Sequence, residues 1–208
     1  MNIIIHRGTH QIGGSAIEIS TASTRIILDF GNELSLDEKY IPINLDIDGV
    51  TKGMPDCDGI VISHYHIDHL GQLTSALPEI PLYMGKLSKE VAMIATEHQD
   101  KDLYLRLLGA NTFRGGEAFT IGNIHIRPLV IDHSAVDSYM FVIEAEGKRV
   151  LYTGDFRMHG LRHHVLEKLV KTYIGEIDVL ITEGTSLSRA TEDCISELAV
   201  LDDISSYI

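Results

Sequence analysis

The sequence predicts an α/β protein, in which apolar strands alternate with stretches of helical spacing. The chain has 208 residues, of which 44% are hydrophobic, and this suffices for one good-sized packed domain. Short apolar runs typical of buried strands recur along the whole chain. Clusters of His and Asp follow several of these runs, and ligand sites in α/β proteins collect at such strand ends.

The first half of the chain opens with strands and continues with mixed elements. We expect strands at 2–6, 16–20, 25–30, 59–62 and 82–84, and helices at 70–77, 86–98 and 102–108. The segment from Asn32 to Pro55 has few periodic signals, which indicates a long surface excursion. The glycine-rich turn at 7–14 is no P-loop, because no Lys-Ser/Thr pair follows it.

The second half continues the alternation of strands and helices. We expect strands at 118–121, 124–131, 138–144, 149–153 and 178–182, and helices at 165–174 and 191–207.

Four metal-binding side chains lie directly after the strand expected at 59–62: His64, His66, Asp68 and His69. His64 and His66 are two residues apart, so a loop at a strand end can direct both rings toward one ion. Asp68 and His69 could turn toward a second ion beside the first. Imidazole and carboxylate ligands without thiolate suit zinc, iron or manganese. A polar loop that is rich in His by chance is the alternative, and this spacing makes it the less favoured one.

Two further strand ends carry ligand-type residues. His133 follows the strand expected at 124–131, where it could be the third ligand of the first ion. Asp155 follows the strand expected at 149–153 and could reach between two ions and bridge them. An ordinary turn residue is the alternative for each, and the cluster at His64 to His69 makes it less favoured.

Charge and composition limit the class of protein. The net charge of −13 argues against tight, non-specific nucleic-acid binding by the whole surface. Cys57 and Cys194 lie far apart, which predicts free thiols in a reducing cytoplasm. No apolar run approaches the roughly 18 residues that span a bilayer, and the first residues read as a strand, not as a signal peptide. We therefore expect a cytoplasmic protein without a membrane partner.

The segment from His64 to His69 resembles the signature of the metallo-β-lactamase superfamily. Together with Asp132-His133-Ser134, Thr153-Gly154-Asp155-Phe156 and Glu183-Gly184-Thr185, it resembles the N-terminal catalytic lobe of β-CASP nucleases such as RNase J. The resemblance covers about residues 3–189. It implies an αββα sandwich, with two mixed sheets face to face, helices outside and the site along one sheet edge.

The resemblance also implies roles for individual residues. Two divalent ions, most readily zinc with manganese or iron as alternatives, are expected on His64, His66, Asp68, His69, His133 and Asp155. Asp29 matches a residue that supports the metal-binding loops by hydrogen bonding. Glu183 matches an acid that supports the site or handles protons, and so joins Asp68 and Asp155 as a catalytic candidate. Ser134 and Ser138 are candidate substrate contacts.

The function expected from the resemblance is metal-dependent hydrolysis of a phosphodiester, with RNA as the preferred substrate. Two ions about 3.5–4 Å apart would hold a hydroxide that attacks phosphorus. One alternative is a thioesterase or lactonase of the glyoxalase-II type that uses the same ions. Another is an incomplete, non-catalytic lobe that needs a partner.

One departure from the family concerns the end of the chain. Family members carry a last His ligand near the end of the catalytic lobe, whereas no His follows His164 here. We therefore expect residues 1–189 to form a metallo-β-lactamase-like lobe that lacks its C-terminal part. Residues 190–208 are expected to be a terminal helix that leads toward an absent β-CASP-like domain. That domain or a homodimer partner would complete the site.

Overall fold

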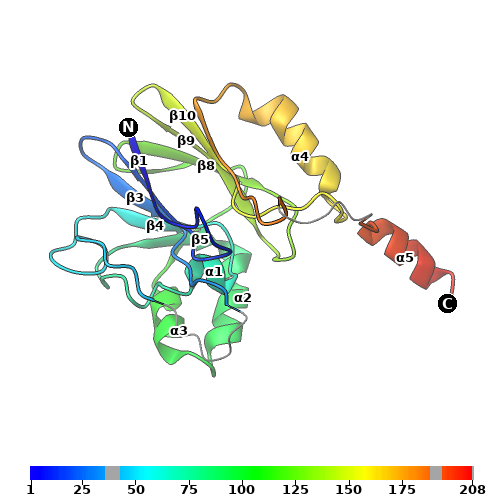
Figure 1. Cartoon of the computed structure of the whole chain (residues 1–208), viewed down its shortest axis with the longest axis horizontal. Coiled ribbons are helices and arrows are strands. Elements are labelled where there is room, and N and C mark those ends of the chain that lie inside the picture. Colours follow the sequence, from blue (N-terminus) through cyan, green and yellow to red (C-terminus); the bar gives the residue numbers. More distant parts are fainter. Residues whose placement is uncertain (36–42, 188–193, 208) are drawn as a thin grey trace.

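The computed structural model describes residues 1–35, 43–187 and 194–207. Two β-sheets pack face to face, and helices lie on the outer side of each (Figure 1). The αββα sandwich of two mixed sheets that the family resemblance implied is thereby confirmed.

The first sheet is mixed and has six strands in sequence order in the described part of the chain. The strands are β1 (Asn2–Arg7), β2 (Ala16–Ser20), β3 (Arg25–Leu28), β4 (Gly59–Ile62), β5 (Leu82–Gly85) and β6 (Asn111–Phe113). β1 to β3 pair antiparallel, and β3 to β6 pair parallel. The parallel half places the carboxyl ends of β3 and β4 at one edge of the sheet.

The second sheet has the order β11-β10-β9-β8-β7. Its strands are β7 (Phe119–Ile121), β8 (Ile124–Val130), β9 (Tyr139–Ala145), β10 (Lys148–Tyr152) and β11 (Val179–Ile181). β7 to β10 pair antiparallel and β11 pairs parallel to β10, so β8, β10 and β11 run in the same direction. Their carboxyl ends therefore emerge at one edge of the sheet.

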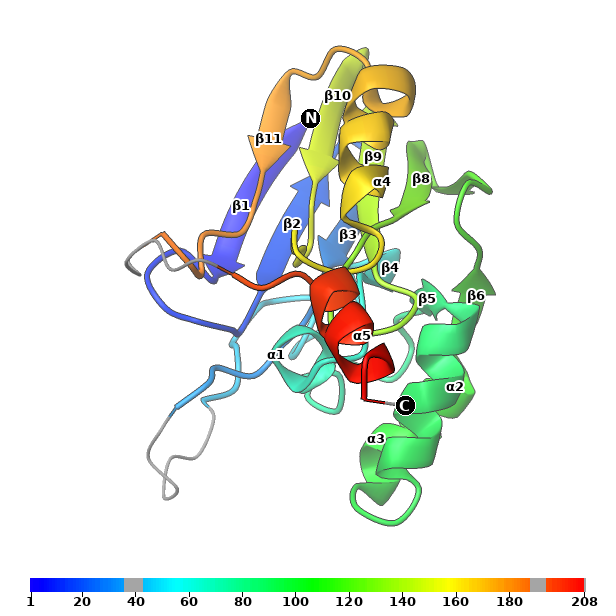
Figure 2. The same ribbon diagram turned by 90° about the vertical axis from the view of Figure 1, so that its right-hand side faces the viewer.

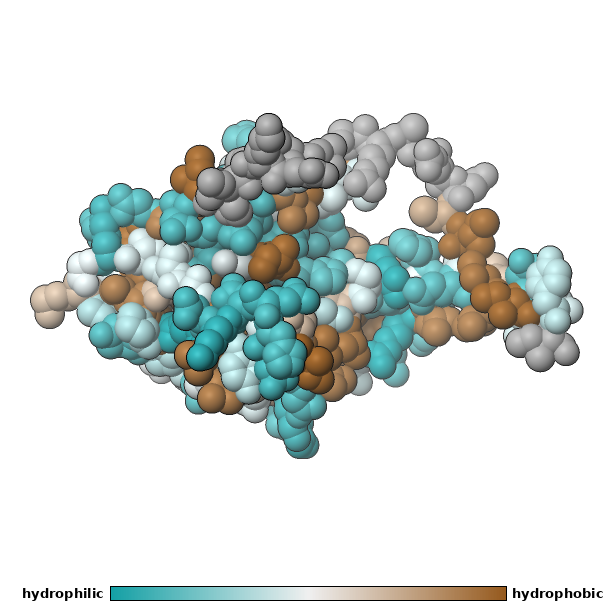
Figure 3. All heavy atoms as spheres, turned by 90° about the horizontal axis from the view of Figure 1, so that it is seen from below, coloured by the Kyte–Doolittle hydropathy of each residue, from teal (hydrophilic) through white to brown (hydrophobic). Residues whose placement is uncertain are grey.

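Helices cover both outer faces (Figures 1 and 2). The helices are α1 (Ile67–Leu70), α2 (Lys86–Thr96), α3 (Lys101–Leu108), α4 (His163–Leu169) with the π-helical turn η1 (Val170–Ile174), and α5 (Glu197–Ser205). α5 projects from the body, and its apolar side chains Leu198, Leu201 and Ile204 are exposed at the protruding end (Figures 1 and 3). In the described ranges, no helix is both long and apolar enough to cross a membrane.

The core has three layers because successive side chains of a strand point to opposite faces of its sheet. On β3, Ile26 and Leu28 pack between the two sheets, whereas Ile27 packs under the helices that follow β4 and β5. On β9, Phe141 faces the first sheet, and Met140 faces the layer formed with α4 and η1.

Most of the expected elements are present, and two differences stand out among the described residues. The helix expected at 70–77 is wrong: α1 ends at Leu70, because the amide of Gln72 donates to the carbonyl of Phe30 and leaves the helical pattern. β6 was not expected. The predicted domain boundary at 189/190 and the start of the predicted 191–207 helix lie outside the described residues.

Candidate metal centre

Three strand ends deliver the candidate ligands to one place. β4 leads into Ser63 and His64, β8 leads to His133, and β10 leads to Asp155. β4 belongs to the first sheet, and β8 and β10 belong to the second, so the ligands meet at the shared edge of the sandwich.

The first group consists of His64, His66 and His133, whose ligand atoms all lie within 4.8 Å of one another. Nδ1 of His66 lies 3.1 Å from Nε2 of His64 and 3.2 Å from Nε2 of His133. Ring nitrogens at about 2.0–2.1 Å from a tetrahedral ion lie about 3.3–3.4 Å apart, close to these values. The spacing of the three rings therefore fits a single metal ion.

The rings of this group are held in the neutral form that binds metal. Burial lowers the pKa of His64, His66 and His133, the last to about 4. Ser63 Oγ lies 2.8 Å from a carboxylate oxygen of Asp29 and 3.0 Å from Nδ1 of His64. Since the hydroxyl donates to the carboxylate, it accepts from Nδ1–H of His64, and the lone pair of His64 stays on Nε2.

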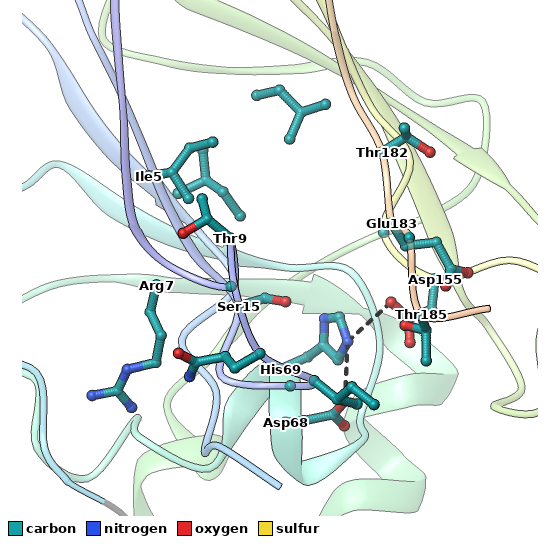
Figure 4. Close-up of a pocket in the computed structure, with 18 of the residues that line it drawn as sticks. Ile5, Arg7, Thr9, Ser15, Asp68, His69, Asp155, Thr182, Glu183 and Thr185 are labelled. Carbon is teal, nitrogen blue, oxygen red and sulfur yellow. Dashed lines mark ion pairs between the residues drawn. The ribbon is translucent and has the colours of Figure 1, made fainter. Parts of the chain in front are cut away.

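The second group joins His64, His69 and Asp155. Nε2 of His69 lies 3.3 Å from Oδ1 of Asp155 and 3.6 Å from Oδ2 of Asp68 (Figure 4). The other oxygen of Asp155 lies 3.9 Å from Nε2 of His133. Each carboxylate oxygen of Asp155 thus faces one of the two groups, which is the placement expected of a bridging ligand.

Asp29 connects the two ligand groups through hydrogen bonds to Ser63 and His69. Its side chain is fully buried and accepts hydrogen bonds from the amide and hydroxyl of Ser63, from Nδ1 of His69 and from the hydroxyl of Tyr152. The bond to Nδ1 directs Nε2 of His69 toward Asp155. Burial lowers the pKa of His69, but Asp29 and Asp155 outweigh burial and raise that pKa to about 10. Burial, followed by Asp29, raises the pKa of Tyr152, which keeps its hydroxyl a donor.

The short helix α1 docks through its backbone, and this fixes Asp68 and His69. The carbonyl of Asp68 accepts from the amide of Ser15, and the carbonyl of His69 accepts from the amide of Phe30. The approach requires glycine at position 31, because a Cβ there would lie 1.6 Å from the carbonyl oxygen of Asp68. Gly31 therefore allows α1 to dock against the segment that follows β3.

A cavity of about 590 Å³ opens beside the second group and is lined by Asp68, His69, Asp155 and Glu183, among others (Figure 4). Glu183 follows β11, and its Oε1 accepts from the amide of Phe156, next to Asp155. It therefore lies where it can support the Asp155 loop.

The two candidate substrate serines differ in exposure. Ser134 is exposed beside His133. Ser138 is buried, and its hydroxyl donates to the carbonyl of Ala135, a contact within the loop between β8 and β9. Contact of either side chain with substrate stays a prediction.

Sequence reasoning missed the supporting roles of Ser63 and Tyr152. Ser63 stands directly before His64, so its position in the motif was a usable signal. Tyr152 lies 123 residues from Asp29 in the chain, and its place at the end of an apolar strand suggested only a core residue.

Two mixed sheets with helices outside are the architecture of the metallo-β-lactamase fold, and the cluster of His and Asp at their edge is a candidate metal centre. A family model described as the beta-lactamase superfamily domain matches residues 26–198, and the chain belongs to this superfamily.

The relatives include ribonucleases. The chain is 29% identical over 195 residues to an RNase J-like protein of Methanocaldococcus jannaschii, a match that covers 86% of this chain and 41% of that one. It is 28% identical over 200 residues to the endoribonuclease ysh-1 of Neurospora crassa, covering 86% of this chain and 23% of the relative. The chain thus spans less than half the length of these curated relatives. The resemblance to this group of nucleases is confirmed.

A solved structure shares the fold over nearly the whole chain. A protein of unknown function from Enterococcus faecalis V583 superimposes with a TM-score of 0.81 at 21% identity, over 99% of this chain and 56% of that one.

Proposed function

We propose that the protein is a metal-dependent phosphodiesterase that cleaves RNA. The observation that carries the proposal is the convergence of His64, His66 and His133, with Asp155 placed between this group and His69. The identities of the relatives, an endoribonuclease and an RNase J-like protein, support RNA as the substrate.

The residues fit two divalent ions, most readily zinc, with manganese or iron as alternatives. One ion would be held by His64, His66 and His133. The other would be held by Asp68 and His69, and Asp155 would contact both ions. When bound, such ions lower the pKa of water and neutralise charge on phosphoryl oxygens.

The chain itself supplies orientation and proton handling. Asp29 fixes the ring of His69, and Ser63 fixes the ring of His64, so that each presents Nε2 to the site. Glu183 holds the loop that carries Asp155. Because Glu183 also lines the cavity, we assign it proton transfer during hydrolysis.

Part of the RNA-binding surface is proposed to come from outside this chain. The net charge of −13 opposes contact with a polyanion except close to bound cations. We therefore propose that a further lobe, or a second copy of the chain, contributes to the RNA cleft. Light scattering of the protein with and without a short RNA would distinguish a monomer from an assembled state.

The mutational test uses Asp68→Ala and His66→Ala. Each should reduce hydrolysis of a short RNA and of bis-p-nitrophenyl phosphate by at least about 100-fold, because each removes a ligand. His125→Ala is the matched control, because His125 is exposed and its ring bonds to the nearby Thr120. Undiminished hydrolysis in both ligand variants would refute the proposal. Faster turnover of S-lactoylglutathione than of either phosphodiester would favour the thioesterase alternative.

A further inference from the structure

A salt bridge outside the ligand set joins the two loops that carry His133 and Asp155. Asp132, the neighbour of His133, is 4% exposed, and its carboxylate accepts from Nε of Arg157 at 3.0 Å. The backbone amide of Arg157 also donates to the carbonyl of Asp132, at 2.9 Å. Arg157 follows Asp155 by two residues, so these contacts tie the end of β8 to the end of β10.

The other side of the same guanidinium binds α5. An NH2 group of Arg157 lies 2.7 Å from Oε1 of Glu197, the first residue of that helix. Glu197 also accepts from the amide of Leu161, and its own amide donates to the carbonyl of His159. The loop after Asp155 is therefore held from both sides, by Asp132 and by α5.

We propose that Arg157 is a positioning residue that sets the separation of His133 and Asp155, and that Glu197 makes this separation depend on α5. The proposal rests on the proposed function in one respect, namely that His133 and Asp155 are metal ligands. Arg157 is not one of the candidate ligands. It acts through Asp132, which is adjacent to one ligand in the chain.

The chemistry of arginine suits this task. Its planar guanidinium offers separate donors in a fixed fork, so one side chain can bind two carboxylates at once. Lysine has a single point charge, and it can satisfy only part of this arrangement. Without Arg157, the buried carboxylate of Asp132 loses its charged partner and is held only by a weaker, neutral donor, the amide of Arg162 at 2.8 Å. A buried carboxylate without its counter-ion turns toward water, and this would displace the adjacent His133.

The test measures metal affinity and backbone protection together. Competition with a chromophoric chelator for Zn²⁺ should show a 10–100-fold loss of affinity in Arg157→Gln, the range seen when groups that orient ligands are removed. Arg157→Lys should recover part of the loss, and Glu197→Gln should show a smaller one. Arg149→Gln is the matched control, because Arg149 lies at the other end of β10 and also pairs with a carboxylate, that of Glu144.

Hydrogen exchange of the metal-free protein provides the second measurement. In Arg157→Gln, the amide of Arg162 should exchange at least about tenfold faster, because its acceptor is the Asp132 carboxylate. This arm does not require metal or activity.

The outcomes separate the inference from the proposed function. The inference would be overturned if Arg157→Gln kept both its Zn²⁺ affinity and the exchange rate of the Arg162 amide within twofold of the parent protein. It would also be overturned if Arg149→Gln lost as much Zn²⁺ affinity as Arg157→Gln. Loss of affinity in Arg157→Gln, in a protein that hydrolyses no phosphodiester, would support the inference and refute the function. If Arg157→Gln does not fold, Glu197→Gln decides: unchanged affinity and exchange there overturn the dependence on α5.

Discussion

Substitution of Asp29 by Asn changes one atom of the residue that connects the ligand groups. The side chain keeps its size, and its backbone has a φ of +54°, a left-handed conformation that Asn tolerates as well as Asp. Backbone strain therefore does not contribute to the effect. What changes is that an NH₂ group replaces an oxygen that accepts hydrogen bonds.

The expected cost follows from the donors that surround this oxygen. Oδ2 accepts from the hydroxyls of Ser63 and Tyr152 and from Nδ1 of His69, while Oδ1 accepts from the amide of Ser63. An amide in place of Oδ2 faces three donors. Hydrogen bonds to a charged group contribute about 1.5–3 kcal/mol each, and some are recovered by reorientation, so we expect a loss of about 3–5 kcal/mol.

The same change affects the metal. The new NH₂ group at position 29 would donate a hydrogen bond to Nδ1 of His69, so the ring proton of His69 would lie on Nε2. Nε2 is the atom that faces Asp155, and a protonated Nε2 cannot bind a metal ion. Metal affinity should fall by about 10–100-fold.

Urea unfolding of the metal-free protein and chelator competition measure the two effects. Asp58→Asn is the control, because Asp58 is exposed and accepts from one backbone amide, that of Arg25. A loss below about 1 kcal/mol in Asp29→Asn, or an equal loss in the control, would refute the reasoning.

Three further predictions concern stability. Burial lowers the pKa of His69, but two facing carboxylates raise it to about 10, so its stabilisation is complete below about pH 6.5 and is lost as the pH rises toward 10. Burial lowers the pKa of His133 to about 4, so the free energy of unfolding also falls as the pH decreases from about 6.5 toward 4. Urea unfolding in EDTA should therefore show maximal stability between about pH 4 and pH 10, and a monotonic pH profile would contradict this prediction. Gly31→Ala should lower the free energy of unfolding in urea by at least about 3 kcal/mol, because the added Cβ meets the backbone of α1. Gly109→Ala is the control and should change that free energy by about 1 kcal/mol or less, because a Cβ there meets nothing closer than 3.9 Å. Similar values for both variants would contradict the docking of α1. Tyr152→Phe should cost about 1.5–3 kcal/mol and leave the metal content unchanged, and loss of metal would show a larger role.

The sequence predicted the strands well because their apolar runs are local signals. β2 and β4 have the bounds expected, and the other expected strands differ by two residues at most at either end. β6 was missed because its three residues include one buried side chain, that of Phe113. The end of α1 was missed because it depends on the carbonyl of Phe30, a residue far away in the sequence.

The convergence of the ligands was predictable from the same strands. His64, His133 and Asp155 each follow an apolar run, and ligand sites in α/β proteins collect at such strand ends. The supporting contacts were not predictable in this way. The pairs Tyr152–Asp29 and Arg157–Glu197 each join residues that are far apart in the sequence, and no local pattern marks such pairs.

Two ions are proposed to bind at the candidate metal centre, one to His64, His66 and His133 and one to Asp68 and His69, with Asp155 between them. Elemental analysis of protein purified without added metal or chelator tests this proposal most directly. We predict close to two divalent ions per chain. One ion or none per chain would contradict the two-ion centre.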